Sequence, residues 1–314
     1  MPCAVPDAPA SGSISIPMTV AALTVALVYL RGWFRLRRAS PNAASIRKLI
    51  AFVGGSLTVW IAVGSPLATL DHAKLTFHMV QHLLLMTIAA PLILLGEPVT
   101  TLRHGLPTSV VDRVVNPLLR RLRAVGTLLT HPVCCWLAGT AVVIAWHIPA
   151  LFELAMHSPF WHAVQHASFL AGGLLFWWPV IQPSPGIARW PRWSLPLYLF
   201  LATLPCDALS AFLTFCGHVV YPTHGAGATD ALRLQDQELA GSLMWCWVTF
   251  AYVIPAVVIT IQLLGVGVSL VDSGARDLTP LSTNQTALVE IPTVAKRAQL
   301  EWFLSPSHAK WHDS

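Results

Sequence analysis

The chain has 314 residues, of which 55% are hydrophobic and only 11% charged, whereas a soluble domain carries roughly 25% charged residues. This composition excludes an ordinary soluble protein and predicts a polytopic membrane protein, whose 13 tryptophans favour the membrane–water interfaces. The net charge of +5 is compatible with a nucleic-acid partner, but the basic residues follow the predicted membrane topology instead, so no nucleic acid is expected.

Seven segments are long and apolar enough to cross a bilayer as helices, which takes about 20 mainly apolar residues each. In chain order they are Ile14–Phe34, Leu49–Pro66, Leu75–Gly96, Pro132–Ala155, Phe160–Ile181, Leu195–Cys216 and Leu239–Gly267. The expected fold is therefore an all-α integral membrane protein, a bundle of seven transmembrane helices over residues 14–267. A short external N-terminus (1–13) precedes it, and a cytoplasmic, mostly disordered tail (268–314) follows it.

The basic residues indicate which side of the membrane each loop faces. All but two of the 19 Lys and Arg residues fall in the first, third and fifth loops or in the C-terminal tail; the exceptions are Lys74 and Arg233. Because cytoplasmic loops carry the excess of Lys and Arg, the N-terminus is expected outside and the C-terminus inside. The basic cluster also follows the first segment instead of preceding it, which argues against a cleaved signal peptide.

The pattern His-x-Val-Gln-His occurs twice, each time near the outer start of an inward-running segment. Positions i and i+4 share one face of a helix, so each copy directs two imidazoles the same way. A lone histidine here would be read as an interfacial residue bonded to water or lipid, but ionisable groups at one depth on several helices indicate a working site. The metal ligands predicted from this pattern, together with the histidine that ends the fourth segment at a similar depth, are His78, His82, His147, His162 and His166.

Other polar and sulfur-bearing residues are candidates for accessory roles. Imidazole accepts several transition metals, whereas thioether and thiolate select Cu(I), so nearby Met and Cys residues favour copper. Amides one residue before a motif histidine can orient its ring, and a carboxylate within a helix needs a partner, a proton or a metal. The accessory candidates are Asp207, Gln81, Gln165, Met79 and Cys206. Asp71 and Glu153 are expected to be solvated at the outer interface, and Pro149 is expected to kink its helix and aim His147 inward.

Three blocks of sequence carry a family resemblance. The first runs from Phe77-His78-Met79-Val80-Gln81-His82 to Gly96-Glu97-Pro98, the second is Trp146-His147-Ile148-Pro149, and the third joins His162 and Gln165-His166 to Phe176-Trp177-Trp178-Pro179. Together, over about residues 45–265, they resemble the CtaG-type, multi-spanning cytochrome c oxidase assembly factors.

This resemblance implies a non-enzymatic role in maturing a haem–copper terminal oxidase of the respiratory chain. It implies a multi-pass protein of the bacterial cytoplasmic (inner) membrane, with copper as the cargo and oxidase subunits, membrane lipid and a periplasmic or external copper donor as partners. On this reading, Cu(I) arrives from outside, is held by the five histidines and passes to an oxidase subunit.

Two other readings stay open. Two histidines on facing helices can hold a haem iron axially, so a membrane protein with haem b and a redox role is the chief alternative. The small residues Ala89, Ala90, Gly172 and Gly173 would supply the slot that haem needs. The other alternative is a metal-free scaffold, in which the histidine pairs only bond helices together.

Overall fold

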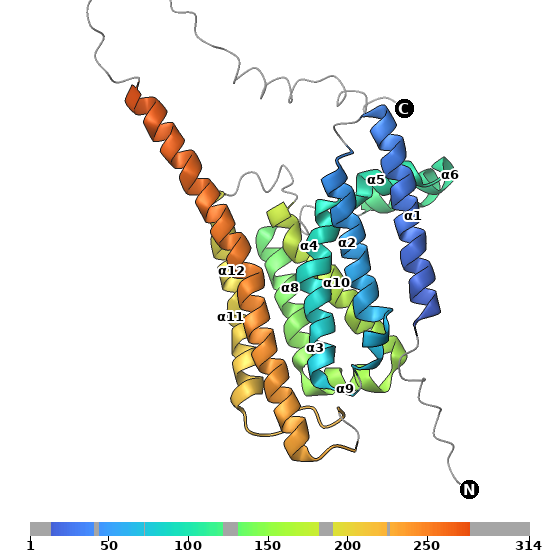
Figure 1. Cartoon of the computed structure of the whole chain (residues 1–314), viewed down its shortest axis with the longest axis vertical. Coiled ribbons are helices and arrows are strands. Elements are labelled where there is room, and N and C mark those ends of the chain that lie inside the picture. The colour runs from blue at the N-terminus through green and yellow to red at the C-terminus, as the bar shows by residue number, and fades with distance from the viewer. Residues whose placement is uncertain are drawn as a thin grey trace, which may run out of the picture. The chain divides into compact units, whose positions relative to one another are not determined.

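The computed structural model describes residues 14–40, 44–71, 73–121, 131–181, 191–224 and 227–276, and this part of the chain is helical, without strands (Figure 1). The predicted external N-terminus (1–13) and the predicted tail from residue 277 onward lie outside it. In chain order the elements are α1 (Ile16–Ala39), α2 (Ile46–Val63), η1 (Pro66–Thr69), α3 (Leu75–Leu83), η2 (Leu84–Ala89), α4 (Ala90–Leu95), α5 (Pro98–Gly105), α6 (Thr108–Val110), η3 (Val111–Val115), α8 (Pro132–His147), α9 (Pro149–His157), α10 (Pro159–Ile181), α11 (Ser194–Phe215) and α12 (Asp230–Arg276).

The described helices agree with a multi-pass membrane protein. Six are long and apolar enough to cross a membrane, and the bent pair α8 and α9 makes a seventh crossing if it forms one span. The ends of α2, α10 and α11 fall within a few residues of those predicted from hydropathy. The chain divides into two compact units, Met1–Val266 and Gly267–Ser314, and all the site residues belong to the first.

The predicted span over Pro132–Ala155 is bent where a kink was expected at Pro149, and the bend is a full break that divides the span into α8 and α9. The helices α8 and α9 meet there at 75°. Ile148 has an extended backbone, with φ −68° and ψ 123°, as expected for a residue whose helical conformation would clash with the following proline ring. Pro149 then occupies the first turn of α9, where its missing N–H is not needed. The break therefore leaves His147 as the last residue of α8.

The last helix is longer than the predicted Leu239–Gly267 at both ends. It begins at Asp230, and the Thr229 hydroxyl accepts a hydrogen bond from the amide of Leu232 at 3.4 Å. The first turns, Asp230–Glu238, are polar, so hydropathy alone does not reveal them, although Ala, Leu, Gln and Glu are good helix formers. At the other end, helical backbone continues past Gly267 to Arg276.

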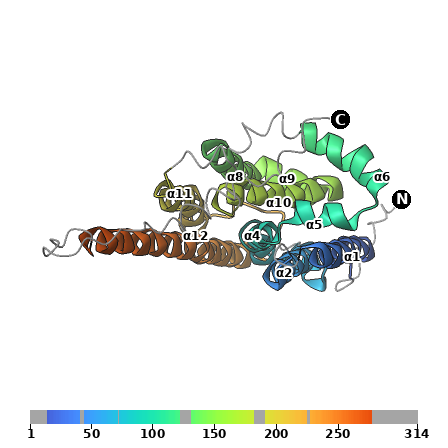
Figure 2. The same ribbon diagram turned by 90° about the horizontal axis from the view of Figure 1, so that it is seen from above.

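The span that carries the first histidine motif lies at the centre of the bundle. The stretch α3–η2–α4 is 61% buried, the highest value among the candidate spans of the described chain, and it packs against α2 and α10 (Figure 2). Its middle, η2, is a π-helical segment in which the Ala90 amide bonds the Leu85 carbonyl. Pro91 has no N–H to continue this register to Met86. The indole of Trp177 on α10 donates to the Met86 carbonyl instead, at 3.0 Å.

A glycine allows α10 to approach this central span closely. A Cβ atom on Gly173 would lie 2.9 Å from both the Cα and the carbonyl oxygen of Met86. Real Cβ atoms essentially never come so near to backbone, so the helix separation requires glycine here. Because of this contact, the two helices that carry the histidine motifs lie side by side.

Candidate metal centre

The two histidine motifs meet because their helices start in the same register. Each of α3 and α10 begins three residues before the first motif histidine, at Leu75 and Pro159. The rings of His78 and His162 are stacked with centroids 5.6 Å apart, and those of His82 and His166 lie 5.5 Å apart. Since a helix rises about 1.5 Å per residue, the pair His82 and His166 lies roughly 6 Å further from the helix starts than the pair His78 and His162.

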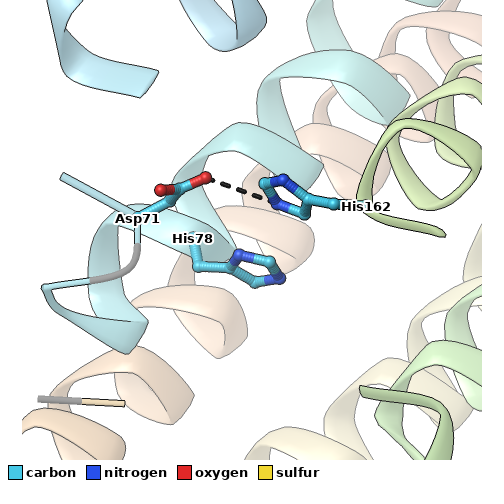
Figure 3. A group of neighbouring side chains, drawn as sticks. All are labelled: Asp71, His78 and His162. Carbon is cyan, nitrogen blue, oxygen red and sulfur yellow. Dashed lines mark ion pairs between the residues drawn. The ribbon is translucent and has the colours of Figure 1, made fainter. Parts of the chain in front are cut away.

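The pair nearest the helix starts is joined by a carboxylate that the sequence placed in solvent. Asp71 is only 2% exposed, and its Oδ2 lies 3.3 Å from Nε2 of His162 (Figure 3). The metal-binding atoms of Asp71, His78 and His162 all lie within 4.8 Å of one another. The expectation of a solvated Asp71 is therefore wrong. Asp71 lies between η1 and α3, outside any helix, so no periodicity in the sequence predicts its burial.

The buried rings of His78 and His82 have no hydrogen-bond partner in the part of the chain that the structure describes. Their exposed fractions are 0% and 5%, and neither ring nitrogen of either residue is hydrogen-bonded there. A neutral imidazole has one N–H and one lone pair, and leaving them unsatisfied costs about 1–3 kcal/mol per group. A bound ion or ordered water would satisfy these atoms, so the cluster has the polarity of a ligand site.

His147 presents a lone pair of defined position. Its Nδ1 lies 2.7 Å from the Val143 carbonyl, which can only accept, so Nδ1 carries the proton and Nε2 the lone pair. Histidines that bind metals commonly hold their other N–H on a backbone carbonyl in this way. The break after α8 leaves the His147 carbonyl at a helix end, and the Tyr221 hydroxyl donates to it at 2.8 Å. Burial raises the pKa of Tyr221, so this hydroxyl stays protonated at neutral pH.

The motif glutamines differ in their surroundings. Gln81 Oε1 accepts from Nε2 of His166 at 3.2 Å, which leaves Nδ1 of His166 to face another group. Gln165 is fully buried, and neither atom of its amide has a hydrogen-bond partner among the described residues. Gln81 thus orients a motif histidine across the two helices, whereas the Gln165 side chain is a buried amide without a hydrogen bond in the described part of the chain.

The other predicted accessory residues separate into two groups. Met79 and Cys206 line a small cavity, about 30 Å³ in volume, together with His82 and His147. Asp207 does not line this cavity; it is half-buried on α11, and its Oδ1 has no hydrogen-bond partner within the described ranges. The structure thus brings three of the five accessory candidates, Gln81, Met79 and Cys206, to the histidines.

A sixth histidine, which the sequence did not single out, joins the cluster. His224 lies in the loop between α11 and α12, is 4% exposed, and has its ring centroid 5.4 Å from that of His78. Phe152 packs against both rings and Phe169 stacks on His82 at 4.0 Å, so aromatic side chains wall the site. The only sequence signal for His224 was its place on the same predicted side of the membrane.

Fold and site together define a multi-pass helical membrane protein with a buried histidine–carboxylate cluster between its spans. The family model described as cytochrome c oxidase caa3 assembly factor (Caa3_CtaG) matches residues 27–265. The chain belongs to this family. The match confirms the resemblance inferred from the histidine blocks and extends it into α1.

Curated proteins of mycobacteria are similar to the same region. The chain is 27% identical over 236 residues to the uncharacterized proteins Mb0105 of Mycobacterium bovis and MT0111 of Mycobacterium tuberculosis, covering 72% of this chain and 35% of each relative. It is 23% identical over 259 residues to the uncharacterized protein ML1998 of Mycobacterium leprae, covering 77% of this chain and 37% of that one. The chain therefore spans about a third of the length of these relatives. No solved structure matches it.

Proposed function

We propose that this protein is an assembly factor for a haem–copper cytochrome c oxidase that binds copper at the histidine cluster and delivers it to an oxidase subunit. Family membership supports the role in oxidase assembly. The histidine end faces the outside of a bacterial cytoplasmic membrane, where a copper donor loads it. No substrate bond is made or broken, so the protein acts as a chaperone and not as an enzyme.

The observation that carries the metal-binding part is the set of buried ring nitrogens on His78 and His82 without hydrogen bonds among the described residues. These rings lie beside His162, which is held by Asp71, and His166, which is held by Gln81. Such a carboxylate or amide behind a histidine is the usual support of a metal ligand, because it fixes the tautomer and the ring orientation.

The ligand types favour copper over harder ions. Imidazole suits Zn, Cu, Fe and Ni, whereas Mg and Ca prefer all-oxygen sites. The thioether of Met79 and the thiol of Cys206 line the cavity beside His82 and shift this preference toward Cu(I). Haem is less well supported, because that cavity holds about 30 Å³ whereas ligand pockets usually hold about 300–1,000 Å³.

Element-specific mass spectrometry of the full chain, purified in mild detergent from cells supplied with copper and iron, tests this function. We expect roughly one copper or more per chain, and a loss of most of it in the double variant His82→Asn/His166→Asn. The matched control is His157→Asn/His218→Asn, which changes two exposed histidines at the same end of the bundle. Copper in the terminal oxidase of cells carrying each variant is measured in parallel.

Three other results would contradict the copper assignment. Iron in place of copper, with a haem absorbance band, would establish the redox alternative. Copper retained in full by the folded His82→Asn/His166→Asn variant would place the ion elsewhere. A wild-type protein without metal, whose histidine variants still support a fully metallated oxidase, would establish the scaffold alternative.

A further inference from the structure

A cavity lies further into the bundle than the group formed by Asp71, His78 and His162, and its wall has different chemistry. It is bounded by one face of the central span, with contributions from α8, α10, α11 and α12. The metal-binding side chains that line it are Met79, His82, Met86, His147, Cys206 and Met244. Three thioethers, one thiol and two imidazoles thus surround a space of about 30 Å³ in an otherwise apolar wall.

Two buried imidazoles mark this cavity as a ligand site and not merely a packing gap. His147 is 8% exposed, and its Nε2, which bears the lone pair, has no hydrogen-bond partner in the described part of the chain. His82 is 5% exposed, and both of its ring nitrogens are likewise unsatisfied there. Truly empty cavities are apolar, and a space above about 10–15 Å³ with polar groups on its wall has room for a water or an ion.

The central span places its ligands in one line. His78, His82 and Met86 follow one another at intervals of four residues, so they lie on one side of the helix. Residues four apart on an α-helix drift slowly around its axis, because the helix has about 3.6 residues per turn. The wider π turns of η2, which begin after His82 and include Met86, oppose this drift. Met86 is 6% exposed and so remains inside the bundle.

We propose that this cavity is a second, deeper copper site, selective for Cu(I) and formed by His82, His147 Nε2 and the thioethers of Met79, Met86 and Met244. His82 is the ligand that it shares with the Asp71–His78–His162 group, since its ring centroid lies 4.3 Å from that of His78. This inference rests on the proposed copper function. The ion moves inward by exchanging the Asp71 carboxylate and His162 for neutral thioethers; the carboxylate keeps its contact with His162, so copper stays Cu(I) and no proton is transferred.

Softness explains why the two sites differ. Carboxylate and imidazole ligands near the helix starts accept several divalent ions, whereas thioethers bind Cu(I) in preference to harder or divalent ions. The deeper site therefore binds the Cu(I) that the oxidase needs and excludes any zinc that is bound by Asp71, His78 and His162. A monovalent ion also suits a buried site better, since the cost of burying charge rises with the charge.

X-ray absorption at the copper edge, on the full chain loaded with Cu(I) under reducing conditions, tests the proposal. We expect sulfur scatterers around copper in the wild-type protein. In the double variant Met86→Leu/Met244→Leu we expect them to decrease sharply, and the variant to lose copper to a Cu(I) chelator that the wild-type protein withstands. Leucine nearly conserves the volume of methionine, so the variant should fold, and thermal unfolding checks this. The matched control, Met18→Leu/Met156→Leu, changes two methionines that do not line the cavity.

The outcomes separate this inference from the proposed function. Copper bound only by nitrogen and oxygen in the wild-type protein would overturn the sulfur site and leave the histidine site standing. Unchanged sulfur scattering in the folded Met86→Leu/Met244→Leu variant would overturn the assignment of these two ligands. A wild-type protein that binds no copper would overturn the proposed function and this inference together.

Discussion

At the scale of single residues, the pairing of Asp71 with His162 is the least expected feature of the site. A carboxylate that is 2% exposed is strongly desolvated, and such a charge persists inside a protein only with a partner. The 3.3 Å contact to His162 supplies one, and His78 completes the group. Asp71 thus contributes both negative charge and orientation to the end of the bundle where copper is proposed to enter.

Replacing Asp71 tests this contribution. We expect Asp71→Asn to weaken copper binding by about 10–100-fold, because the amide removes the charge that holds His162 and attracts the ion. Chelator competition on the purified full chain measures the change. The control Glu153→Gln makes the same chemical change on a half-buried carboxylate at the same end of the bundle and should leave copper affinity near that of the wild type. Equal affinity of the two variants would remove Asp71 from the site.

At the scale of elements, the start of α3 is fixed by α12. Lys74 provides no side-chain cap for α3. Asp236 of α12 accepts instead from the Leu75 amide and from the Thr76 hydroxyl, each at 2.6 Å. A carboxylate at a helix N-terminus satisfies free N–H groups and interacts favourably with the helix dipole. The polar first turns of α12, which hydropathy missed, therefore position the helix that carries His78 and His82.

Removing this cap should destabilise the histidine end of the bundle. We expect Asp236→Ala to cost about 1–3 kcal/mol of stability, since two donors lose their acceptor. Thermal unfolding in detergent, followed by circular dichroism, provides the measurement. Asp230→Ala serves as the control, because Asp230 is 87% exposed and makes only a surface ion pair with Arg233. If both variants melted at the wild-type temperature, the hydrogen bonds of Asp236 would not contribute to the stability of the protein.

The close approach of α10 to η2 gives a second prediction at this scale. We expect Gly173→Ala to cost about 1–3 kcal/mol and to weaken copper binding although no histidine is replaced, because the added Cβ meets the Met86 backbone and separates the two motifs. Gly54→Ala is the control, since its Cβ would meet nothing nearer than 3.8 Å. Copper affinity and melting temperature are measured for both. Wild-type values for Gly173→Ala would show that the helices separate without consequence.

At the scale of the whole molecule, the histidines and most basic side chains belong to opposite ends of the first compact unit. The site lies where α3 and α10 begin and α8 ends, whereas Arg31–Arg38 fall at the end of α1 and Arg47 and Lys48 at the start of α2. Figure 1 shows α9 at the lower end of the bundle and α5 and α6 at the upper end. The positive-inside rule then predicts that the site faces the outside.

Cysteine labelling in intact cells tests this orientation. In a chain whose native cysteines are replaced, we expect Asp230→Cys to react with a membrane-impermeant maleimide from outside. Arg38→Cys, on the last turn of α1, should react only after the cells are opened. Both positions are exposed, so accessibility within the protein does not limit either reaction. The reverse pattern would place the histidine end in the cytoplasm and contradict delivery of copper from outside.

The sequence by itself determined the class, the family and the face on which the motif histidines lie. Hydropathy and the four-residue spacing are local properties, and a membrane forces apolar segments to satisfy their backbone as helices, so α2, α10 and α11 could be placed closely. The spacing also predicted that each motif directs two rings one way.

Only the tertiary structure decided which residues complete the site. Asp71 and His224 lie in loops that have no periodicity, and their burial depends on how those loops cover the ends of α3 and α10. Tertiary packing also decided that Met86 and Met244, from distant segments, line one cavity and that Asp207 does not line it. A side chain's partners are set by long-range packing, in which the glycine contact at Gly173 and the chain break at Ile148 fix distances that no local pattern encodes.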